Sequence, residues 1–305
     1  MKKAILISAA LLLTGCLLDR QDAYDVDYVM EFQPAMLMHV SGEESECFPP
    51  GQSIAARAWE LPEQDSWQEA ASSAQEFLPL TEILPFADGK TWGFEDPVLW
   101  PQRHKRLTFL AYSPFDAGAG CDAETGVSFL DVDVVGNPVD LLYTDPVEDV
   151  DKMECGGTVV LPFRHALCSM NFKIKNRVQT QEQIVVKNIT LENVNYKGDF
   201  HSLLSPQWTL ESERTSFVFF EGEYQTGHLP EDIGQRYLMV PQSLDTQVKV
   251  EYDFFTEQGT FISQKLSTVS MRTVLEPGVN YSFTLSVGID DVIFLVEIIE
   301  DSLEK

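Results

Sequence analysis

The stretch TVVLPFRHALCSMNFKIKN, residues 158–176, decides the fold because its hydrophobic pattern changes phase part-way along. The odd positions of the first half are Val159, Leu161, Phe163, His165 and Leu167, and the even positions of the second half are Ala166, Cys168, Met170, Phe172 and Ile174. Side chains alternate between the two faces of a strand, so a strand that changes parity must turn, bulge or pass to another sheet. We expect that change near residues 164–167 and interpret the stretch as the hinge between two β-domains.

Segments with strand character lie on both sides of this hinge. In the clearest, residues 26–40, the even positions are Val26, Tyr28, Met30, Phe32, Pro34, Met36, Met38 and Val40. Since Pro34 has no N–H donor, we expect this strand at a sheet edge or a bulge. Further strands are predicted at 53–61, 107–112, 140–143, 184–196, 216–220, 236–240, 247–255, 259–266, 280–287 and 292–299. Turn residues separate them and no helical periodicity is sustained, which predicts an all-β protein built from antiparallel sandwiches.

The N-terminus has the three parts of a bacterial lipoprotein signal. Two lysines precede an apolar run at residues 4–13, and Leu13-Thr14-Gly15-Cys16 follows it. The run is too short for a permanent membrane span, and we predict removal of residues 1–15 and acylation of Cys16. The alternative is a buried N-terminal strand with a chance cysteine. Several acyl chains on one residue anchor a protein stably to a membrane without crossing it.

These features divide the chain into a signal at residues 1–15, a lipidated tether at 16–24, an N-terminal β-sandwich domain at 25–157 and a C-terminal β-sandwich domain at 158–305. The net charge of −27 argues against nucleic acid and anionic lipid headgroups as partners. With 44% hydrophobic and 11% aromatic residues, the chain is able to bury large cores.

The cysteines after Cys16 show no spacing that would hold zinc. They are Cys47, Cys121, Cys155 and Cys168, and the sequence does not determine how they pair. Cys168 fits a buried core thiol. Cys121 and Cys155 each lie beside a glycine in a predicted loop and are the favoured pair for a disulfide.

No motif for catalysis, cofactor binding or metal binding is present, and we predict a protein that is not an enzyme and needs no cofactor. The five histidines, His39, His104, His165, His201 and His228, are scattered. The pairs Asp131/Asp133 and Asp149/Asp151 have the chemistry for calcium, but 48 acidic residues form such pairs by chance in solvated loops. His165 alternates with apolar residues and fits a hydrogen-bonded core histidine.

The tryptophans raise a second binding hypothesis, a platform for sugars. They are Trp59, Trp67, Trp92, Trp100 and Trp208. Because they do not cluster in the sequence, core packing explains each of them equally well.

Several blocks together resemble the fimbrillins. After the Cys16 signal come YDVDYVMEFQPAMLMHV, WPQRHKRLTFLAYSPF, DLLYTDP, PFRHALCSMNFKIKN, KNITLENVNYKGDF, YLMVPQSL and EPGVNYSFTLSV. Each block is loose by itself, but their order and spacing from about residue 24 to 290 are similar to those of the type V pilins. These lipoprotein-derived fimbrial subunits include the Mfa-like and FimA-like proteins.

The resemblance implies two transthyretin-like β-sandwich domains and assembly by donor-strand exchange. In this family the first strand is lost after proteolysis and a strand from a neighbouring subunit fills its groove. Transferred to this sequence, residues 26–40 are the strand that is lost and residues 291–303 are the donor. Because residues 291–303 are apolar on both faces, a central strand covered on both sides is an open alternative.

The implied partners are other fimbrial subunits, in homo- or hetero-polymers, the outer membrane through the N-terminal lipid, and a host or bacterial surface ligand. The implied location is the outer membrane and cell surface.

One departure from the family concerns maturation. No Arg or Lys lies between Arg20 and Arg57, so the loop at residues 41–51 offers no site for a basic-specific protease. Arg57, within a predicted strand, is the candidate maturation site. Alternatively another protease cuts, or the chain keeps its first strand and its lipid. A chain of the last kind would be a fimbrial anchor, a minor subunit or a non-polymerising surface lipoprotein that binds glycans.

Overall fold

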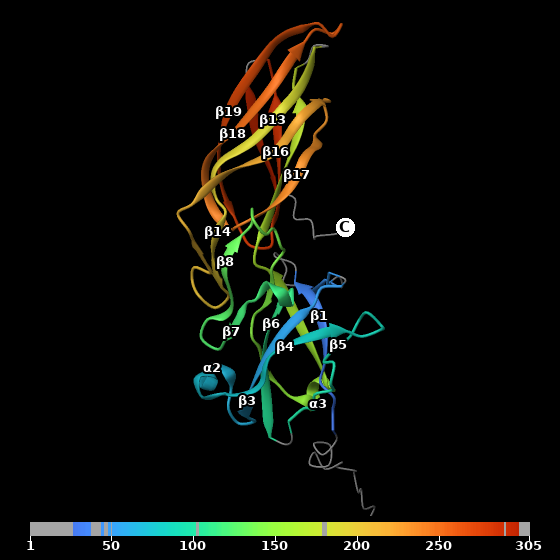
Figure 1. Cartoon of the computed structure of the whole chain (residues 1–305), viewed down its shortest axis with the longest axis vertical. Helices are drawn as coiled ribbons and strands as arrows, with labels where there is room; N and C mark the ends of the chain where they lie inside the picture. The colour runs from blue at the N-terminus through green and yellow to red at the C-terminus, as the bar shows by residue number, and fades with distance from the viewer. Residues whose placement is uncertain are drawn as a thin grey trace, which may run out of the picture.

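The computed structural model describes residues 27–37, 44–45, 48–49, 51–101, 104–178, 182–289 and 291–298. Strands dominate these residues, so the all-β prediction is confirmed. The molecule is elongated, with β1 (Glu31–Leu37) and β3 (Ile54–Pro62) toward one end and β18 (Gln242–Phe255) and β19 (Phe261–Leu275) toward the other (Figure 1). Its short helical segments are α2 (Trp67–Ala70), η1 (Ala71–Ser73), η2 (Phe115–Ala117) and α3 (Lys152–Cys155).

A nine-stranded sheet forms the N-terminal end of the molecule. Its strands are β1 (Glu31–Leu37), β2 (Glu44–Ser45), β3 (Ile54–Pro62), β4 (Gln75–Pro85), β5 (Trp92–Gly93), β6 (Lys105–Ser113), β9 (Leu142–Thr144), β10 (Val147–Val150) and β11 (Thr158–His165). The order is β10-β6-β3-β4-β5-β1-β11-β9, and β9 also pairs with β6, so the sheet closes on itself. At this closure the backbone N–H of Ala111 donates to the Thr144 hydroxyl at 3.0 Å. The enclosed core includes Met30, Phe32, Ile54, Phe109, Val159, Leu161 and Phe163.

The other end is a sandwich of two four-stranded sheets. One sheet has the order β17 (Glu231–Met239), β12 (Cys168–Asn176), β20 (Asn280–Val287) and β21 (Val292–Ile298). The other has the order β16 (Arg214–Gln225), β13 (Gln183–Asn195), β18 (Gln242–Phe255) and β19 (Phe261–Leu275). Phe172 of the first sheet meets Phe219 of the second edge-to-face, with ring centroids 4.7 Å apart.

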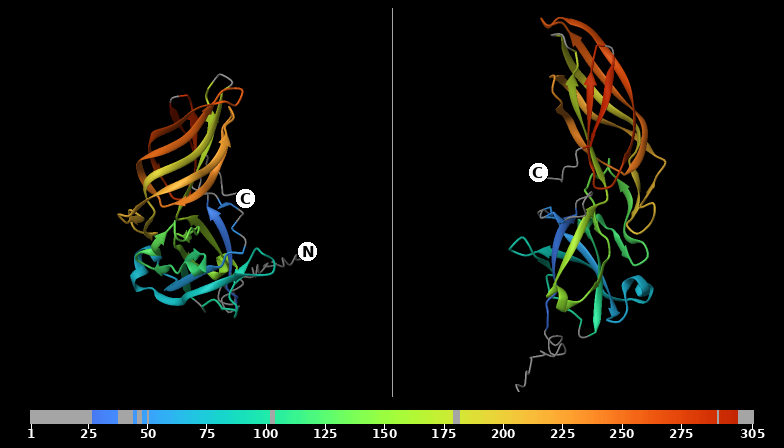
Figure 2. Two further views of the ribbon diagram at one scale, coloured as in Figure 1. Left: turned by 45° about the horizontal axis from the view of Figure 1, so that its top comes forward. Right: turned by 180° about the vertical axis from the view of Figure 1, so that it is seen from behind.

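A fourth sheet lies between these two ends and draws strands from both halves of the sequence (Figure 2). Its order is β15 (Trp208–Leu210), β14 (Lys197–His201), β8 (Gly126–Asp133) and β7 (Gly120–Asp122). Phe129 contacts Tyr112 of β6 at 5.8 Å between ring centroids, and Phe200 contacts Tyr143 of β9 at 4.8 Å. One apolar cluster therefore continues from the outer side of β6 into the sandwich.

The predicted change of sheet in residues 158–176 is confirmed. Val159, Leu161 and Phe163 of β11 are buried in the enclosed core, whereas β12 pairs with β17 and β20 in the sandwich. Ala166 and Leu167 connect the two strands. The predicted domain boundary lies earlier, between residues 157 and 158, but β11 pairs with β1 and β9 and so belongs to the N-terminal sheet. With the fourth sheet shared as well, the division into domains 25–157 and 158–305 stays a prediction.

Candidate functional site

The first described strand, β1, lies inside its sheet, so the predicted edge position is wrong. It pairs in parallel with β11, from Glu31 opposite Thr158 to Met36 opposite Phe163. Its other flank meets β5 at Phe32 and β2 at Met36 and Leu37. The sheet closes around β1 and leaves it no free edge. Pro34 fits because, within the described residues, positions 33–35 have no strand partner on the β5 flank, so a residue without an N–H loses no ladder bond there.

The buried face of β1 follows the predicted alternation. Met30, Phe32, Pro34 and Met36 are buried, whereas Gln33 is exposed. Val26, Met38 and Val40 lie outside the described residues. The Phe32 ring meets Phe94 and Phe109 edge-to-face, at 5.6 Å and 5.8 Å between centroids. The strand therefore contributes Phe32 and Met36 to the core that the closed sheet encloses.

Backbone and indole hydrogen bonds hold the beginning of β1. Met30 N–H donates to the Val98 carbonyl at 2.8 Å, and Trp100 N–H donates to the Tyr28 carbonyl at 3.0 Å. The Gly157 carbonyl accepts from Glu31 N–H and from the Trp100 indole, both at 3.1 Å. The segments that precede β6 and β11 therefore hold the beginning of β1. Because β1 and β11 pair in parallel, they do not form a hairpin.

The C-terminal strand β21 occupies a sheet edge, so the alternative of a central strand is wrong. Among the described residues it pairs only with β20, from Val292 opposite Val287 to Ile298 opposite Tyr281. Phe294 stacks on Phe283 with centroids 5.1 Å apart. Residues 299–303 of the predicted donor lie outside the described residues.

Arg57, the candidate maturation site, lies in β3 between β4 and β6. Its guanidinium binds Glu76 with Nε to Oε1 at 2.8 Å, donates to the Cys121 carbonyl at 2.6 Å and lies 5.0 Å over the Trp59 ring. Ala56 and Ala58 on either side are fully buried. A protease that cuts after Arg57 would first have to separate β3 from both neighbouring strands. Cys16 lies outside the described residues.

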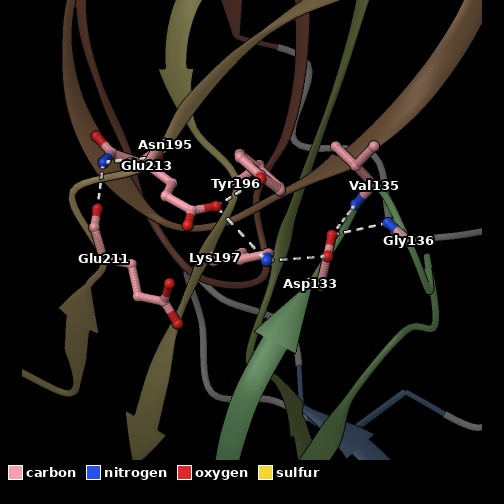
Figure 3. A network of polar contacts seen from close by, with 8 residues as sticks. All are labelled: Asp133, Val135, Gly136, Asn195, Tyr196, Lys197, Glu211 and Glu213. Atoms are coloured by element: carbon pink, nitrogen blue, oxygen red, sulfur yellow. Dashed lines mark hydrogen bonds and ion pairs between the residues drawn. The ribbon is translucent and has the colours of Figure 1, made fainter.

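The acidic pairs considered for calcium have structural roles. Asp133 accepts the backbone N–H groups of Val135 at 2.9 Å and Gly136 at 2.7 Å (Figure 3). The Gly136 hydrogen bond is the main cause of a pKa below the ordinary value for the Asp133 carboxyl. Lys197 Nζ lies between Asp133, at 3.7 Å, and Glu213, at 3.6 Å. These contacts join β8 to β14 and to the turn before β16.

The second acidic pair caps backbone groups. Asp149 accepts Trp67 N–H at 3.0 Å, and Asp151 accepts Met153 N–H at 2.7 Å at the start of α3. Within the described residues there is no group of three or more His, Cys, Asp or Glu side chains that would hold a metal ion.

Cys121 and Cys155, the more plausible pair among the pairings left open, form no disulfide with each other: both are free thiols, as is Cys168. Cys121 lies in the cluster that continues into the sandwich, whereas Cys155 packs against the enclosed core of the N-terminal sheet. Burial raises the pKa of the Cys121 thiol to about 12 and also raises the pKa values of Cys155 and Cys168. Protonated, buried thiols are poor nucleophiles. Cys47 lies outside the described residues.

The described histidines are all engaged in hydrogen bonds. Their partners are Glu63 for His104, Asp140 for His165, Ser128 for His201 and the Asn176 carbonyl for His228. His39 lies outside the described residues. His165 is half-buried with its Nδ1 3.0 Å from Asp140 Oδ1, as expected for a hydrogen-bonded histidine.

All five tryptophans are at most 8% exposed, so they form no platform for sugars. The described part of the chain also has no helix with the length and apolar character to cross a membrane. Among the candidates for a functional site, the two strands β1 and β21 remain.

Solved structures with the same fold come from Bacteroides. A fimbrial protein from Bacteroides vulgatus matches with a TM-score of 0.67 and 15% identity, over 89% of this chain and 99% of that one. A candidate cell adhesion protein from Bacteroides uniformis matches with a TM-score of 0.55 and 13% identity, over 89% and 98%. Another candidate cell adhesion protein, from Bacteroides ovatus, matches with a TM-score of 0.54 and 13% identity, over 92% of this chain and 99% of that one. No curated protein matches the chain. The fimbrillin-like family model matches residues 67–301, and the chain therefore belongs to the fimbrillin-like family.

Proposed function

We propose that this chain is a fimbrial subunit or a fimbria-associated surface lipoprotein, with a structural and adhesive role. In this proposal the precursor is lipidated at Cys16, carried to the outer membrane and displayed at the cell surface. Its partners are other fimbrial subunits, and its outermost copies meet a host or bacterial surface ligand. Family membership supports the fimbrial role. The observation that carries the assembly mechanism is the position of β1.

β1 has the properties of a strand that another chain can replace. It comes first in the described sequence, forms no hairpin with β11, and inserts Phe32 and Met36 into the enclosed core. Without it, the sheet would open between β5 and β11 and expose a groove lined by Trp92, Leu161 and Phe163, among others. Such a groove favours β-augmentation, in which main-chain hydrogen bonds supply affinity and alternate side chains enter apolar pockets.

β21 suits the role of the donor because it is an edge strand at the C-terminal end of the described chain. Among the described residues β20 is its one strand partner, so its release from the sandwich would break a single strand pairing together with the packing of Val292 and Phe294 on the core. Edge strands are the ones that pair most readily with another chain. The donor in this proposal is the segment at residues 291–303.

Maturation decides between a shaft subunit and an anchor. The setting of Arg57 in β3 supports cleavage at another position or retention of β1. A chain that keeps β1 and the lipid would act as a fimbrial anchor or as a non-polymerising surface lipoprotein. Mass spectrometry of the native N-terminus separates these roles: an acylated Cys16 indicates the anchor, and an internal residue beyond β1 indicates the shaft.

The assembly proposal is tested with a chain that lacks residues 17–40. Mixed with intact copies, it should form ladders or filaments that are visible by electrophoresis and electron microscopy. Deletion of residues 291–305 from both chains should abolish them. A truncated chain that stays monomeric with intact copies at high concentration would contradict donor-strand assembly and favour the anchor.

A further inference from the structure

Strand β20 is buried on both faces, although one of those faces is polar. Tyr281, Phe283, Leu285 and Val287 point into the sandwich core. On the opposite face Ser282, Thr284 and Ser286 are only 2%, 0% and 4% exposed. The hydroxyl oxygens of these three residues are buried and, within the part of the chain that the structure describes, have no hydrogen-bond partner.

The hydroxyl row lies between β12 and β21. On the β12 side, Asn171, Lys173 and Lys175 stand in register with Ser282, Thr284 and Ser286. On the β21 side, the backbone positions in register are those of Glu297, Leu295 and Ile293. β12 cannot leave without breaking the sheet, because it pairs with both β17 and β20. β21 is the neighbour that can leave.

Polar side chains farther from β21 on the same sheet are well bonded. Arg236 donates from Nη1 to the Ser169 hydroxyl at 2.9 Å and from Nη2 to the side-chain Oδ1 of Asn171 at 3.2 Å. Asn171 in turn donates to Asp232 at 2.8 Å. These side chains of β12 and β17 have partners, whereas the three hydroxyls without one belong to β20, the strand that pairs with β21.

A buried hydroxyl without a partner destabilises the state that buries it. Strands that stay covered on both faces normally carry apolar residues on both, and valine has nearly the shape of threonine at position 284. If β21 departs, β20 becomes an edge and its hydroxyls gain access to water. The sequence of β20 therefore suits a strand that loses its neighbour.

We propose that Ser282, Thr284 and Ser286 weaken the docking of β21 on β20 and so keep the C-terminal strand releasable. This inference rests on the proposed function, in which β21 is the strand donated to a neighbouring subunit. The partner that benefits is a second fimbrial subunit with an open groove, because the hydroxyl row lowers the cost of withdrawing the donor strand.

The test is amide hydrogen exchange of the intact chain with Thr284→Val. Removal of one unbonded hydroxyl should slow exchange in β20 and β21 about tenfold and leave β13 and β18 unchanged. Thr268→Val is the matched control, because Thr268 is exposed on the edge strand β19; it should leave β21 unchanged. Ser286→Ala, which only removes atoms, provides a second variant if the valine does not fit. Unchanged or faster exchange of β21 in both Thr284→Val and Ser286→Ala would overturn the proposal.

A second arm separates this inference from the assembly mechanism. Mixed with chains lacking both residues 17–40 and residues 291–305, which can accept a strand but not donate one, intact Thr284→Val copies should assemble about tenfold more slowly than intact wild-type copies. Slower amide exchange together with unchanged assembly overturns the link to release. If no chain assembles but Thr284→Val still slows exchange, the proposed function fails and the effect of the hydroxyl row on β21 docking holds.

Discussion

Phe32→Ala tests how much β1 contributes to the closed N-terminal sheet. Phe32 is fully buried and its ring lies edge-to-face with Phe94 and Phe109. Truncation of a buried phenylalanine to alanine typically costs about 3–5 kcal/mol, because apolar contacts are lost and a cavity is left. Since no side chain in the closed sheet can move far into this space, we expect a loss in the upper part of that range.

The assay is urea unfolding followed by tryptophan fluorescence, since Trp92 and Trp100 lie in the same core cluster as Phe32. Gln33→Ala is the control on the same strand, because Gln33 is exposed, and it should change the free energy of unfolding by less than about 0.5 kcal/mol. A cost below about 1 kcal/mol for Phe32→Ala, close to that of the control, would refute the idea that β1 anchors this core.

Three further predictions concern other parts of the molecule. Arg57→Ala should lower the free energy of unfolding by about 1–2 kcal/mol in urea titrations, because a charged hydrogen bond and a cation–π contact are lost. The folded wild-type chain should resist cleavage by trypsin at Arg57. Rapid cleavage there would contradict the position of Arg57 in β3. Because hydrogen bonds lower the pKa of Asp133, its stabilising contribution is present at neutral pH and is lost as the pH falls through that lowered pKa. Asp133→Asn should flatten acid unfolding curves, and an unchanged curve would count against the hydrogen bonds from Gly136 and Val135. Cys121 and Cys168 should resist iodoacetamide at pH 8 until the chain unfolds, and fast labelling of the native chain, measured by mass spectrometry, would contradict their burial.

Periodicity was sufficient to locate the change of sheet. The parity of apolar residues reverses at Ala166 and Leu167, where β11 ends and β12 begins in another sheet. This worked because one face of each strand meets a core, so burial fixes which residues point inward. The same reasoning identified the buried face of β1.

The place of β1 within the sheet could not be predicted in this way. Pro34 favours an edge when the strand is considered alone, but closure of the sheet depends on pairing between β6 and β9 and between β1 and β11. Residues far apart in the sequence form these pairs, and nothing in the local pattern of either strand specifies the partner.

Several strands were not predicted, and the two longest of them, β4 and β8, were missed for local reasons. β4 is largely exposed and contains Pro79, so it shows no clear alternation. β8 is interrupted at Asp131, which has a positive φ of 53° and whose N–H donates to the Asp199 carboxylate across the sheet. Such a bulge shifts the alternation by one residue and hides the strand from a search for period two.

The burial of the hydroxyl row of β20 could not be predicted from the sequence either. Alternation of polar and apolar residues in NYSFTLSV predicts a strand with one solvated face. The structure buries Ser282, Thr284 and Ser286 because β20 lies between β12 and β21. That position depends on the parallel pairing with β12, which joins segments more than a hundred residues apart.

The measurement that tests the replaceable strand most directly is amide hydrogen exchange of β11 in a chain lacking both residues 17–40 and residues 291–305, which can accept a strand but not donate one, alone and after mixing with intact copies. We predict that the β11 amides facing the β1 position exchange rapidly in the truncated chain alone and become protected on mixing. Mixing with intact copies that lack residues 291–305 should leave them unprotected. Amides of β11 that are already protected in the truncated chain alone, or that stay unprotected with intact copies, would contradict the proposal that a strand from a neighbouring subunit takes the place of β1.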